Sequence, residues 1–378
     1  MIATNPGRAA VRNRDMTAAW RHIDVALCGL VATTSILGAL MIYSATRNKE
    51  ASIPFIDKHI IFMVIGVAAM VAAASIDYIK LRDWARLLYV LGVLSLVGVL
   101  IPGVGSEHKG IRAWYDIGPF QIQPAEVTKV LVIIAVASYL GTSIEKLGPK
   151  QLITALVMFG VPMGLIMLQP DLGTNLVFVM IAAGMFAVAG IPMRFLVALA
   201  IVGIVGVVAI LQSDTLEGYQ RDRLTSFASP DAASSGAVYN TKQSQTAISL
   251  GGLTGQGYLE GEYTAGGSVP EQQTDFIFTV PGEELGFIGS SVLLALLGGI
   301  VWRVWRTAQL ARDQVGRLIS VGVLCLLVFH IFENVGMNLG IMPVTGIPLP
   351  FVSYGGSATI SAFACMGLVL NVHMRRFS

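Results

Sequence analysis

The sequence predicts an all-α, polytopic membrane protein with about ten transmembrane helices and a large extracytoplasmic loop between helices 7 and 8. Of its 378 residues, 54% are hydrophobic and only 13% are charged, and the mean hydropathy is +0.70. A soluble domain carries about twice that share of charged residues. In addition, apolar stretches approaching the roughly 20 residues needed to cross a bilayer recur along the whole chain.

These stretches define ten predicted spans within a single membrane domain that covers residues 1–378. Three segments outside the spans stand out: a basic tail at 1–22, a large loop at 213–281 and a Pro/Gly loop at 340–355. An even number of spans places both termini on the same side of the membrane. The predicted spans are residues 24–44, 58–76, 86–102, 124–141, 151–168, 173–190, 194–212, 282–302, 318–339 and 356–372.

The distribution of Lys and Arg indicates the orientation of these spans. With the N-terminus inside, the cytoplasmic segments hold sixteen of these residues and the outer segments eight, which places both termini in the cytoplasm. No cleavable signal peptide is visible, so the first span is interpreted as a retained anchor. A net charge of +2 is too small to indicate a nucleic-acid partner. Cys28, Cys325 and Cys365 lack metal-ligand spacing and are interpreted as small apolar residues.

Three carboxylates mark the stretch that ends the large loop and leads into the eighth span: Asp275, Glu283 and Glu284. A carboxylate at the membrane edge is costly, so its presence there calls for a reason. Aromatic residues beside Asp275 suit the membrane interface, and a partly desolvated carboxylate can act as a general base toward a sugar or alcohol. The alternative is that Asp275 caps a short interfacial helix, and spacing alone favours that alternative.

The fourth span opens with Pro124, which suits the first turn of a helix. Glu126 and Lys129 follow at i and i+3, so they share a helix face and can pair. An ion pair inside a span faces a cavity or another helix. The sequence leaves a polar cavity wall and a structural pair as equal alternatives. Asp171, in the next outer turn, is interpreted as the N-cap of the sixth span.

The outer loops carry cations that would suit a phosphate or pyrophosphate group. Isolated loop cations more often contact solvent or lipid headgroups, and position alone favours that reading. The candidates are Arg112 in the smaller outer loop and Arg221, Arg223 and Lys242 in the large one.

The stretch Asn334–Ser357 is the most strongly patterned part of the chain. Its prolines at 343, 348 and 350 prevent a regular helix. Non-helical backbone at membrane depth is tolerated only where protein or a water-filled cavity shields it. Gly355–Gly356 lets the backbone approach a neighbour closely. A substrate groove and a rigid structural plug both fit this pattern.

Together these motifs resemble the SEDS family (shape, elongation, division and sporulation), and its RodA branch in particular. The Val-Thr-Gly-Ile-Pro-Leu-Pro sequence after Pro343 is similar to the RodA branch, whereas the FtsW branch usually has a lysine where Val344 or Thr345 stands. The resemblance extends from the third span to the last. The segments that carry it are Gly110–Trp114, Gln123–Lys129, Gln169–Thr174, Gln243–Gly257, Thr274–Gly286 and Asn334–Ser357.

The resemblance implies a peptidoglycan glycosyltransferase with ten helices in the bacterial cytoplasmic membrane. Its substrate would be lipid II, a disaccharide-peptide on undecaprenyl pyrophosphate, which it joins into glycan strands for cell-wall elongation and rod shape on the outer face. The implied partners are a class B penicillin-binding protein, which is the transpeptidase, and other membrane proteins of the elongation complex.

The resemblance also implies roles for particular residues. Asp275 matches the family's essential aspartate, which is usually preceded by His-Thr; here Gln273 replaces the histidine. Glu126 and Lys129 match a polar pair in the central cavity. The matching segments also make Gln243 and Ser353 candidate substrate-binding residues.

The chemistry of glycan polymerisation suits these residues. Asp275 would take the proton from the acceptor's GlcNAc 4-hydroxyl as that oxygen attacks the anomeric carbon of the donor. The leaving lipid pyrophosphate needs cationic stabilisation, which the loop cations could supply. No self-sufficient metal-ligand cluster is visible, so a divalent cation, Mg²⁺ or Mn²⁺, would be shared with the pyrophosphate.

Two other functions compete with the polymerase. A lipid II flippase needs polar sites that open to both faces in turn, whereas the polar groups here concentrate on the outer half. A non-catalytic scaffold for the transpeptidase would tolerate replacement of Asp275 by Asn.

Overall fold

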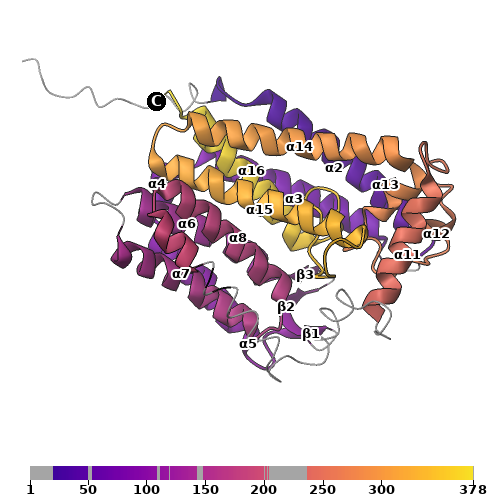
Figure 1. Ribbon diagram of the computed structural model, residues 1–378, viewed down its shortest axis with the longest axis horizontal. Coiled ribbons are helices and arrows are strands. Elements are labelled where there is room, and N and C mark those ends of the chain that lie inside the picture. Colours follow the sequence, from indigo (N-terminus) through magenta and orange to yellow (C-terminus); the bar gives the residue numbers. More distant parts are fainter. Residues whose placement is uncertain are drawn as a thin grey trace, which may run out of the picture.

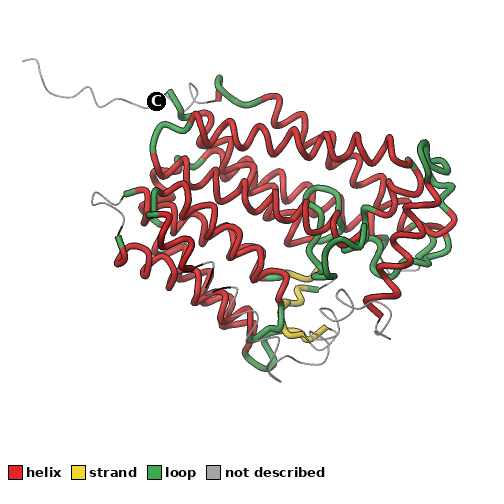
Figure 2. The backbone as a smooth tube through the Cα atoms, viewed as in Figure 1, coloured by secondary structure: helices red, strands yellow, loops and turns green. Residues whose placement is uncertain are grey.

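The computed structural model describes residues 20–49, 53–108, 111–118, 120–142, 148–199, 201, 203 and 236–377. Most of the described chain is helical, and the longer helices form one bundle (Figures 1 and 2). The helices are α2 (Val25–Thr46), α3 (Phe55–Ser75), α4 (Tyr78–Asp83), α5 (Ala85–Leu100), α6 (Pro124–Gly141), α7 (Pro149–Met167), α8 (Leu172–Ala189), α11 (Gly236–Gly251), α12 (Glu262–Ala265), α13 (Thr279–Glu284), α14 (Gly286–Leu310), α15 (Gln314–Asn338) and α16 (Gly356–Met374). The strands are β1 (Ser106–His108), β2 (Ile111–Ile117) and β3 (Phe120–Ile122).

The predicted class, an all-α polytopic membrane protein, is confirmed. In the described part of the chain, eight helices are long and apolar enough to cross a membrane, and α5 is a shorter apolar helix. These helices follow the predicted spans in order. The predicted span at 194–212 is the exception, because only its first part belongs to the described residues, where 193–199 are helical.

The middle of the bundle is built on α15, which packs against α6, α8 and α14. α16 packs mainly against α3 and also against α6, while α2 lies against α14. Of the spanning helices, α6, α15 and α16 have the largest buried shares. Polar side chains on the inner faces of these three helices are therefore shielded from lipid and must find partners inside the protein.

Non-helical chain gathers at the end of the bundle away from the C-terminus (Figure 1). The segment at 103–123, predicted as a loop, holds a three-stranded antiparallel sheet in the order β1-β2-β3. The large predicted loop also differs from expectation, because its described part contains α11, α12 and α13. The strands, α12 and α13 are too short to leave a clear periodicity in the sequence, whereas α11 has 16 residues but is too polar to resemble a membrane span.

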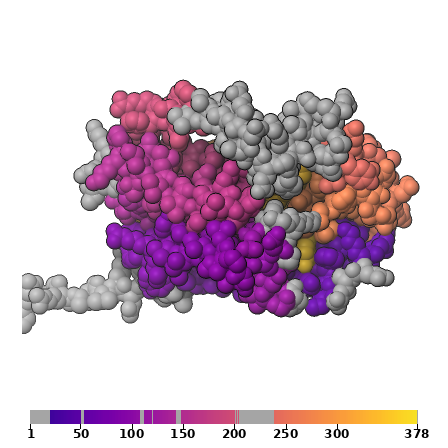
Figure 3. Space-filling model, turned by 90° about the horizontal axis from the view of Figure 1, so that it is seen from below, coloured from indigo at the N-terminus to yellow at the C-terminus, as the bar shows by residue number. Residues whose placement is uncertain are grey.

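The eighth span also begins later than predicted. α14 starts at Gly286, where φ is +64°, and residues 279–284 form the separate helix α13. Apolar residues of the large loop pack inside the protein, among them Ile248, Ile277 and Val280, whereas Leu250 is 44% exposed. In the view from below, the α11 region covers one end of the molecule (Figure 3).

Charged groups fix the end of the bundle where the C-terminus lies. Asp24 caps α2 by accepting from the Leu27 amide at 3.0 Å, and Arg303 of α14 donates to it at 2.9 and 2.6 Å. Arg375, after α16, donates to the carbonyl oxygen of Ala74 at the end of α3, at 3.1 Å. Basic side chains thus satisfy helix-end groups at this end of the bundle.

The contact between α2 and the Pro/Gly loop predicts the effect of one glycine substitution. A Cβ on Gly38 would lie 2.5 Å from the Phe351 carbonyl oxygen and 2.7 Å from the Val352 Cα. Gly38→Ala should therefore force backbone apart and destabilise the fold by roughly 1–3 kcal/mol. We expect a lower unfolding temperature for the purified protein in detergent.

Gly29 on the same helix provides the matched control, because a Cβ there meets nothing within 4 Å. Gly29→Ala should leave the unfolding temperature unchanged or slightly higher. Equal shifts for the two variants would contradict the close approach at Gly38.

Candidate active site

Asp275 lies in the turn segment 270–278 that leads into α13. Its neighbours Phe276 and Ile277 are buried, at 1% and 0% exposure, whereas Asp275 itself is half-buried. Its Oδ2 atom lies 3.4 Å from the position that a Cβ on Gly346 would take. The N-cap of α13 is Phe278, so the structure does not support the capping alternative for Asp275. The carboxylate instead faces the Pro/Gly loop.

Two asparagines of α15 hold the main chain of Asp275. Asn334 Nδ2 donates to the Asp275 carbonyl oxygen at 2.8 Å, and Asn338 Nδ2 donates to the same oxygen at 3.1 Å. Asn334 Nδ2 also donates to the Ile347 carbonyl oxygen at 2.8 Å. Both asparagines are completely buried. One side-chain amide therefore joins the Asp275 segment to the loop that its carboxylate faces.

Ser353, a predicted substrate-binding residue, is 4% exposed and connects the same two segments. Its Oγ donates to the Thr274 carbonyl oxygen at 2.6 Å and accepts from the Leu349 amide at 2.8 Å. These bonds give the hydroxyl a structural role beside Asp275. A part in substrate binding stays a prediction.

Gln273, two residues before Asp275, is also buried. Its Oε1 accepts from Lys49 Nζ at 2.6 Å, and its carbonyl oxygen accepts from the Tyr354 amide at 2.8 Å. Burial lowers the pKa of the Lys49 ammonium, while the nearby Glu271 carboxylate opposes that shift. Lys49 was missed by the sequence analysis because it follows the first span, far along the chain from its partner.

The predicted pairing of Glu126 and Lys129 is confirmed, with 2.7 Å between Oε1 and Nζ. Both side chains are buried, and Lys129 is only 1% exposed. A third member was missed: Lys129 Nζ lies 3.3 Å from His330 Nε2. The other ring nitrogen of His330 lies 3.1 Å from the Pro348 carbonyl oxygen. The pair thus connects α6 to α15 and, through His330, to the Pro/Gly loop.

The two glutamates of α13 make structural contacts. Glu283 accepts from the amides of Tyr263 and Thr264 at 2.6 and 3.0 Å, and from the Thr264 hydroxyl at 2.7 Å. Glu284 is 1% exposed and accepts from the Ser44 hydroxyl. Burial raises the pKa of Glu284, and the hydrogen bond from Ser44 opposes that shift only in part. Both glutamates are buried and hydrogen-bonded, so neither is as accessible to a substrate as the half-buried Asp275.

The remaining predicted residues are not all brought to Asp275. Arg112 on β2 pairs with Glu107 of β1 at 3.3 Å. On α11, Lys242 is exposed and Gln243 half-buried. Arg221 and Arg223 lie outside the described residues. The N-cap predicted at Asp171 is confirmed, since its Oδ1 accepts from the Thr174 amide at 2.9 Å.

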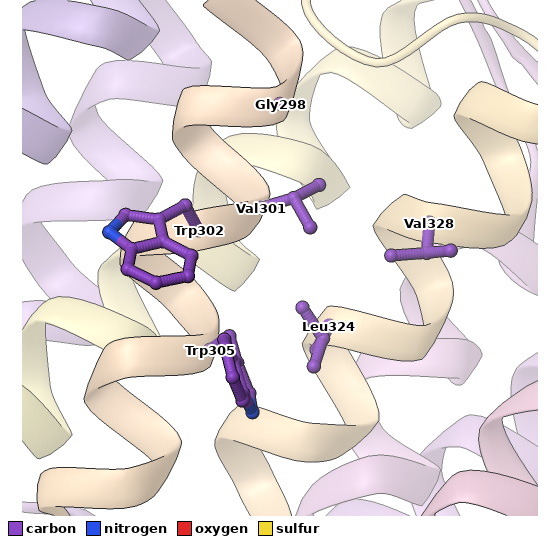
Figure 4. A pocket seen from close by; sticks show the side chains of 6 residues that line it. All are labelled: Gly298, Val301, Trp302, Trp305, Leu324 and Val328. Carbon is purple, nitrogen blue, oxygen red and sulfur yellow. The ribbon is translucent and has the colours of Figure 1, made fainter.

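The described residues contain no group of three or more His, Cys, Asp or Glu side chains that could hold a metal ion. They do form an open apolar groove of about 330 Å³ between α14 and α15 (Figure 4). Its walls carry no charged group, and Trp302 and Trp305 are 57% and 41% exposed. The groove suits an apolar partner rather than a charged substrate. It is lined by Gly298, Val301, Trp302, Trp305, Leu324 and Val328.

The fold and the site define a multi-pass membrane protein that holds a half-buried carboxylate at one end of its bundle and a sealed ion pair inside it. The family model FTSW_RODA_SPOVE, described as cell cycle protein, matches residues 24–377. The chain belongs to this family, which confirms the resemblance seen in its motifs.

Curated relatives support the same family over nearly the whole chain. The chain is 34% identical to the peptidoglycan glycosyltransferase MrdB of Escherichia coli K12 over 355 residues, which cover 94% of each protein. It is 35% identical to the stage V sporulation protein E of Bacillus subtilis 168 over 364 residues, which cover 94% of this chain and 98% of that one.

Solved structures share the fold. A chain of the structure described as "Structural coordination of polymerization and crosslinking by a peptidoglycan synthase complex" superposes with a TM-score of 0.80 at 30% identity, over 94% of this chain and 99% of that one. The rod shape determining protein RodA of Thermus thermophilus superposes with a TM-score of 0.71 at 29% identity, over 95% and 99%.

The environment of Glu284 predicts a pH-dependent gain in stability for Glu284→Gln. Because burial raises the pKa of this carboxyl in the folded protein, the wild type loses stability as pH rises above the pKa of the unfolded chain. Glutamine does not ionise and can still accept from Ser44. We expect the unfolding temperature of the variant to exceed that of the wild type at pH 8, with a smaller difference near pH 4.5.

Glu283→Gln is the matched control, because an amide there would meet the N–H donors of Tyr263 and Thr264. This variant should unfold at a lower temperature at pH 8. A difference between Glu284→Gln and the wild type that does not change with pH would contradict the shifted pKa of Glu284.

Proposed function

We propose that the chain polymerises lipid II into glycan strands for cell-wall elongation and rod shape, with Asp275 as the general base. The chain is a peptidoglycan glycosyltransferase, as its curated relative MrdB is named. The observation that carries the assignment to Asp275 is its setting: the main chain is held by two buried asparagines, while the carboxylate is half-buried and faces a glycine. A base needs this combination of a fixed backbone and an approachable side chain.

The proposed reaction is one displacement. The acceptor's GlcNAc 4-hydroxyl oxygen forms a bond to the anomeric carbon of the donor, and its proton passes to the Asp275 carboxylate. The bond from that carbon to the lipid pyrophosphate breaks, and the pyrophosphate leaves with the electron pair. No protein acid is required for this leaving group.

The charge that builds up on the pyrophosphate needs cations. Our candidates remain Arg112, Lys242 and the two arginines at 221 and 223, with Gln243 as a polar contact. A resident metal does not fit the described residues, which lack a ligand cluster. An Mg²⁺ or Mn²⁺ ion would therefore arrive with the pyrophosphate.

The proposed location is the bacterial cytoplasmic membrane, with both termini in the cytoplasm and the active site on the outer face. The positive-inside rule supports this orientation. Arg303 and Arg375 contact groups at the end of the bundle where the C-terminus lies, and the Asp275 segment leads into α13 at the other end. A lipid II molecule already on the outer leaflet would meet Asp275 there.

A class B penicillin-binding protein is the proposed partner, together with other membrane proteins of the elongation complex. A solved relative belongs to a peptidoglycan synthase complex that coordinates polymerisation and crosslinking. We assign the groove between α14 and α15 to a membrane-spanning segment of this transpeptidase. The groove is open and lined by apolar and aromatic side chains, so a helix can pack there without burying a charged group (Figure 4).

Asp275→Asn tests the proposed function. The amide cannot accept a proton, so the variant should lose at least about a hundredfold in polymerisation rate, within the range that general bases contribute. The measurement is glycan chain length on a gel, with labelled lipid II and the protein purified in complex with its transpeptidase.

Recovery of the intact complex from the Asp275→Asn strain is the control for folding. Polymer from both proteins would remove Asp275 as the base. Absence of polymer from either, with lipid II bound to an intact complex, would favour the flippase or scaffold instead.

Gly298→Leu tests the groove. A Cβ on Gly298 meets nothing within 4 Å, so a larger side chain at this position starts into open space at the groove. We expect co-purification with the transpeptidase to fall severalfold while the unfolding temperature stays the same. Gly160→Leu on α7, where a Cβ also meets nothing within 4 Å, is the matched control. Equal recovery of the partner with both variants would place the interface elsewhere.

A further inference from the structure

We propose that His330 is a positioning residue for the polymerase: its imidazole, oriented by the buried Glu126–Lys129 pair, bonds the Pro/Gly loop that faces Asp275. The inference rests on the proposed function and extends it to a residue that contacts neither substrate nor the reacting atoms. It also gives the ion pair a positioning role, in place of substrate binding.

The ring of His330 has a defined tautomer. Its Nδ1 lies 3.1 Å from the Pro348 carbonyl oxygen, which can only accept, so Nδ1 carries the proton. Its Nε2 lies 3.3 Å from the Lys129 ammonium, which can only donate, so Nε2 is the acceptor. A doubly protonated ring would bring two positive groups together in the bundle. The two partners thus fix a neutral imidazole in one orientation.

The Glu126–Lys129 pair on α6, which contacts His330, is buried inside the bundle. Lys129 is 1% exposed and Glu126 5%, and the Glu126 main chain is tied to α16 because its carbonyl oxygen accepts from Ser361 Oγ at 3.0 Å. The Lys129 ammonium therefore contacts Glu126 and His330 instead of an open cavity. Its position is set by three packed helices, so it holds the imidazole of His330 in one orientation.

The loop on the other side of His330 is held by α15. Besides the bond to Pro348, Asn334 donates to the Ile347 carbonyl oxygen at 2.8 Å, and Glu333 accepts from Thr345 Oγ1 at 2.8 Å. Gly346 lies between these contacts, has a φ of +77° and faces the Asp275 carboxylate. If the loop lost its hydrogen bond at Pro348, Gly346 would move relative to the Asp275 carboxylate.

Two substitutions distinguish the contributions of the two ring nitrogens of His330. The side-chain amide of Asn can place a donor near the position of Nδ1, and that of Gln places its polar atoms near Nε2. His330→Asn therefore keeps the bond to Pro348 and gives up Lys129, whereas His330→Gln keeps an acceptor for Lys129 and gives up Pro348. Initial rates are measured against lipid II concentration, with the transpeptidase complex.

We expect His330→Gln to lower kcat roughly tenfold or more with KM unchanged, because a displacement of about 1 Å in a catalytic site has that effect or a larger one. His330→Asn should recover kcat to within about threefold of the wild type. His373→Gln is the control for replacing a buried histidine, since His373 contacts Thr307 and Arg376 at the C-terminal end. It should leave both constants unchanged.

The proposal is overturned if His330→Gln has the wild-type kcat, if His330→Asn is as slow as His330→Gln, or if KM changes in place of kcat. Should His330→Gln fail to fold, Thr345→Val removes another bond of the same loop, and a wild-type kcat there overturns the proposal as well. A fully active Asp275→Asn in the same assay would instead refute the proposed function, so the two failures are distinguishable.

Discussion

The structure around the site depends on satisfying main-chain carbonyl groups that are buried inside the bundle. A buried polar group without a partner costs about 1–3 kcal/mol, and the prolines at 343, 348 and 350 have no N–H to offer. α15 supplies the missing donors from one face: His330 for Pro348, and Asn334 for both Ile347 and Asp275. The position of the candidate base therefore follows from the hydrogen-bonding needs of a segment that cannot form a helix.

Packing around a strained residue, Phe351, keeps the same loop rigid. Phe351 has a φ of +67°, a conformation that costs a bulky residue on the order of 1–3 kcal/mol unless its surroundings hold it. Its ring packs edge-to-face on Phe363 with centroids 5.6 Å apart, and its carbonyl group presses against Gly38 of α2. Packing on both sides prevents the loop from relaxing, so loop and bundle hold the wall opposite Asp275 in place.

How much the sequence predicts depends on the distance between partners along the chain. The spans, the cap at Asp171 and the pairing of Glu126 with Lys129 are local patterns, and the sequence predicts them. His330 lies 201 residues from Lys129, so no local spacing connects them. The polar positions 330, 334 and 338, which recur at helical spacing in an apolar span, are the signal that would have found this face. The sheet and α11–α13 are too short or too polar to be recognised in the same way.

The burial of the Glu126–Lys129 pair favours one of the two alternatives that the sequence left equal, a structural pair. An ion pair in a dry interior is often no better than well-packed apolar residues, so stability alone does not explain Glu126 and Lys129. The orientation of His330 offers an explanation for the pair. Without the Lys129 ammonium, the imidazole could carry its proton on either nitrogen. The tautomer protonated on Nε2 would turn a lone pair toward the Pro348 carbonyl oxygen and lose that hydrogen bond. The charge inside the bundle thus selects the tautomer that bonds the loop, and through the loop it acts on the geometry around Asp275.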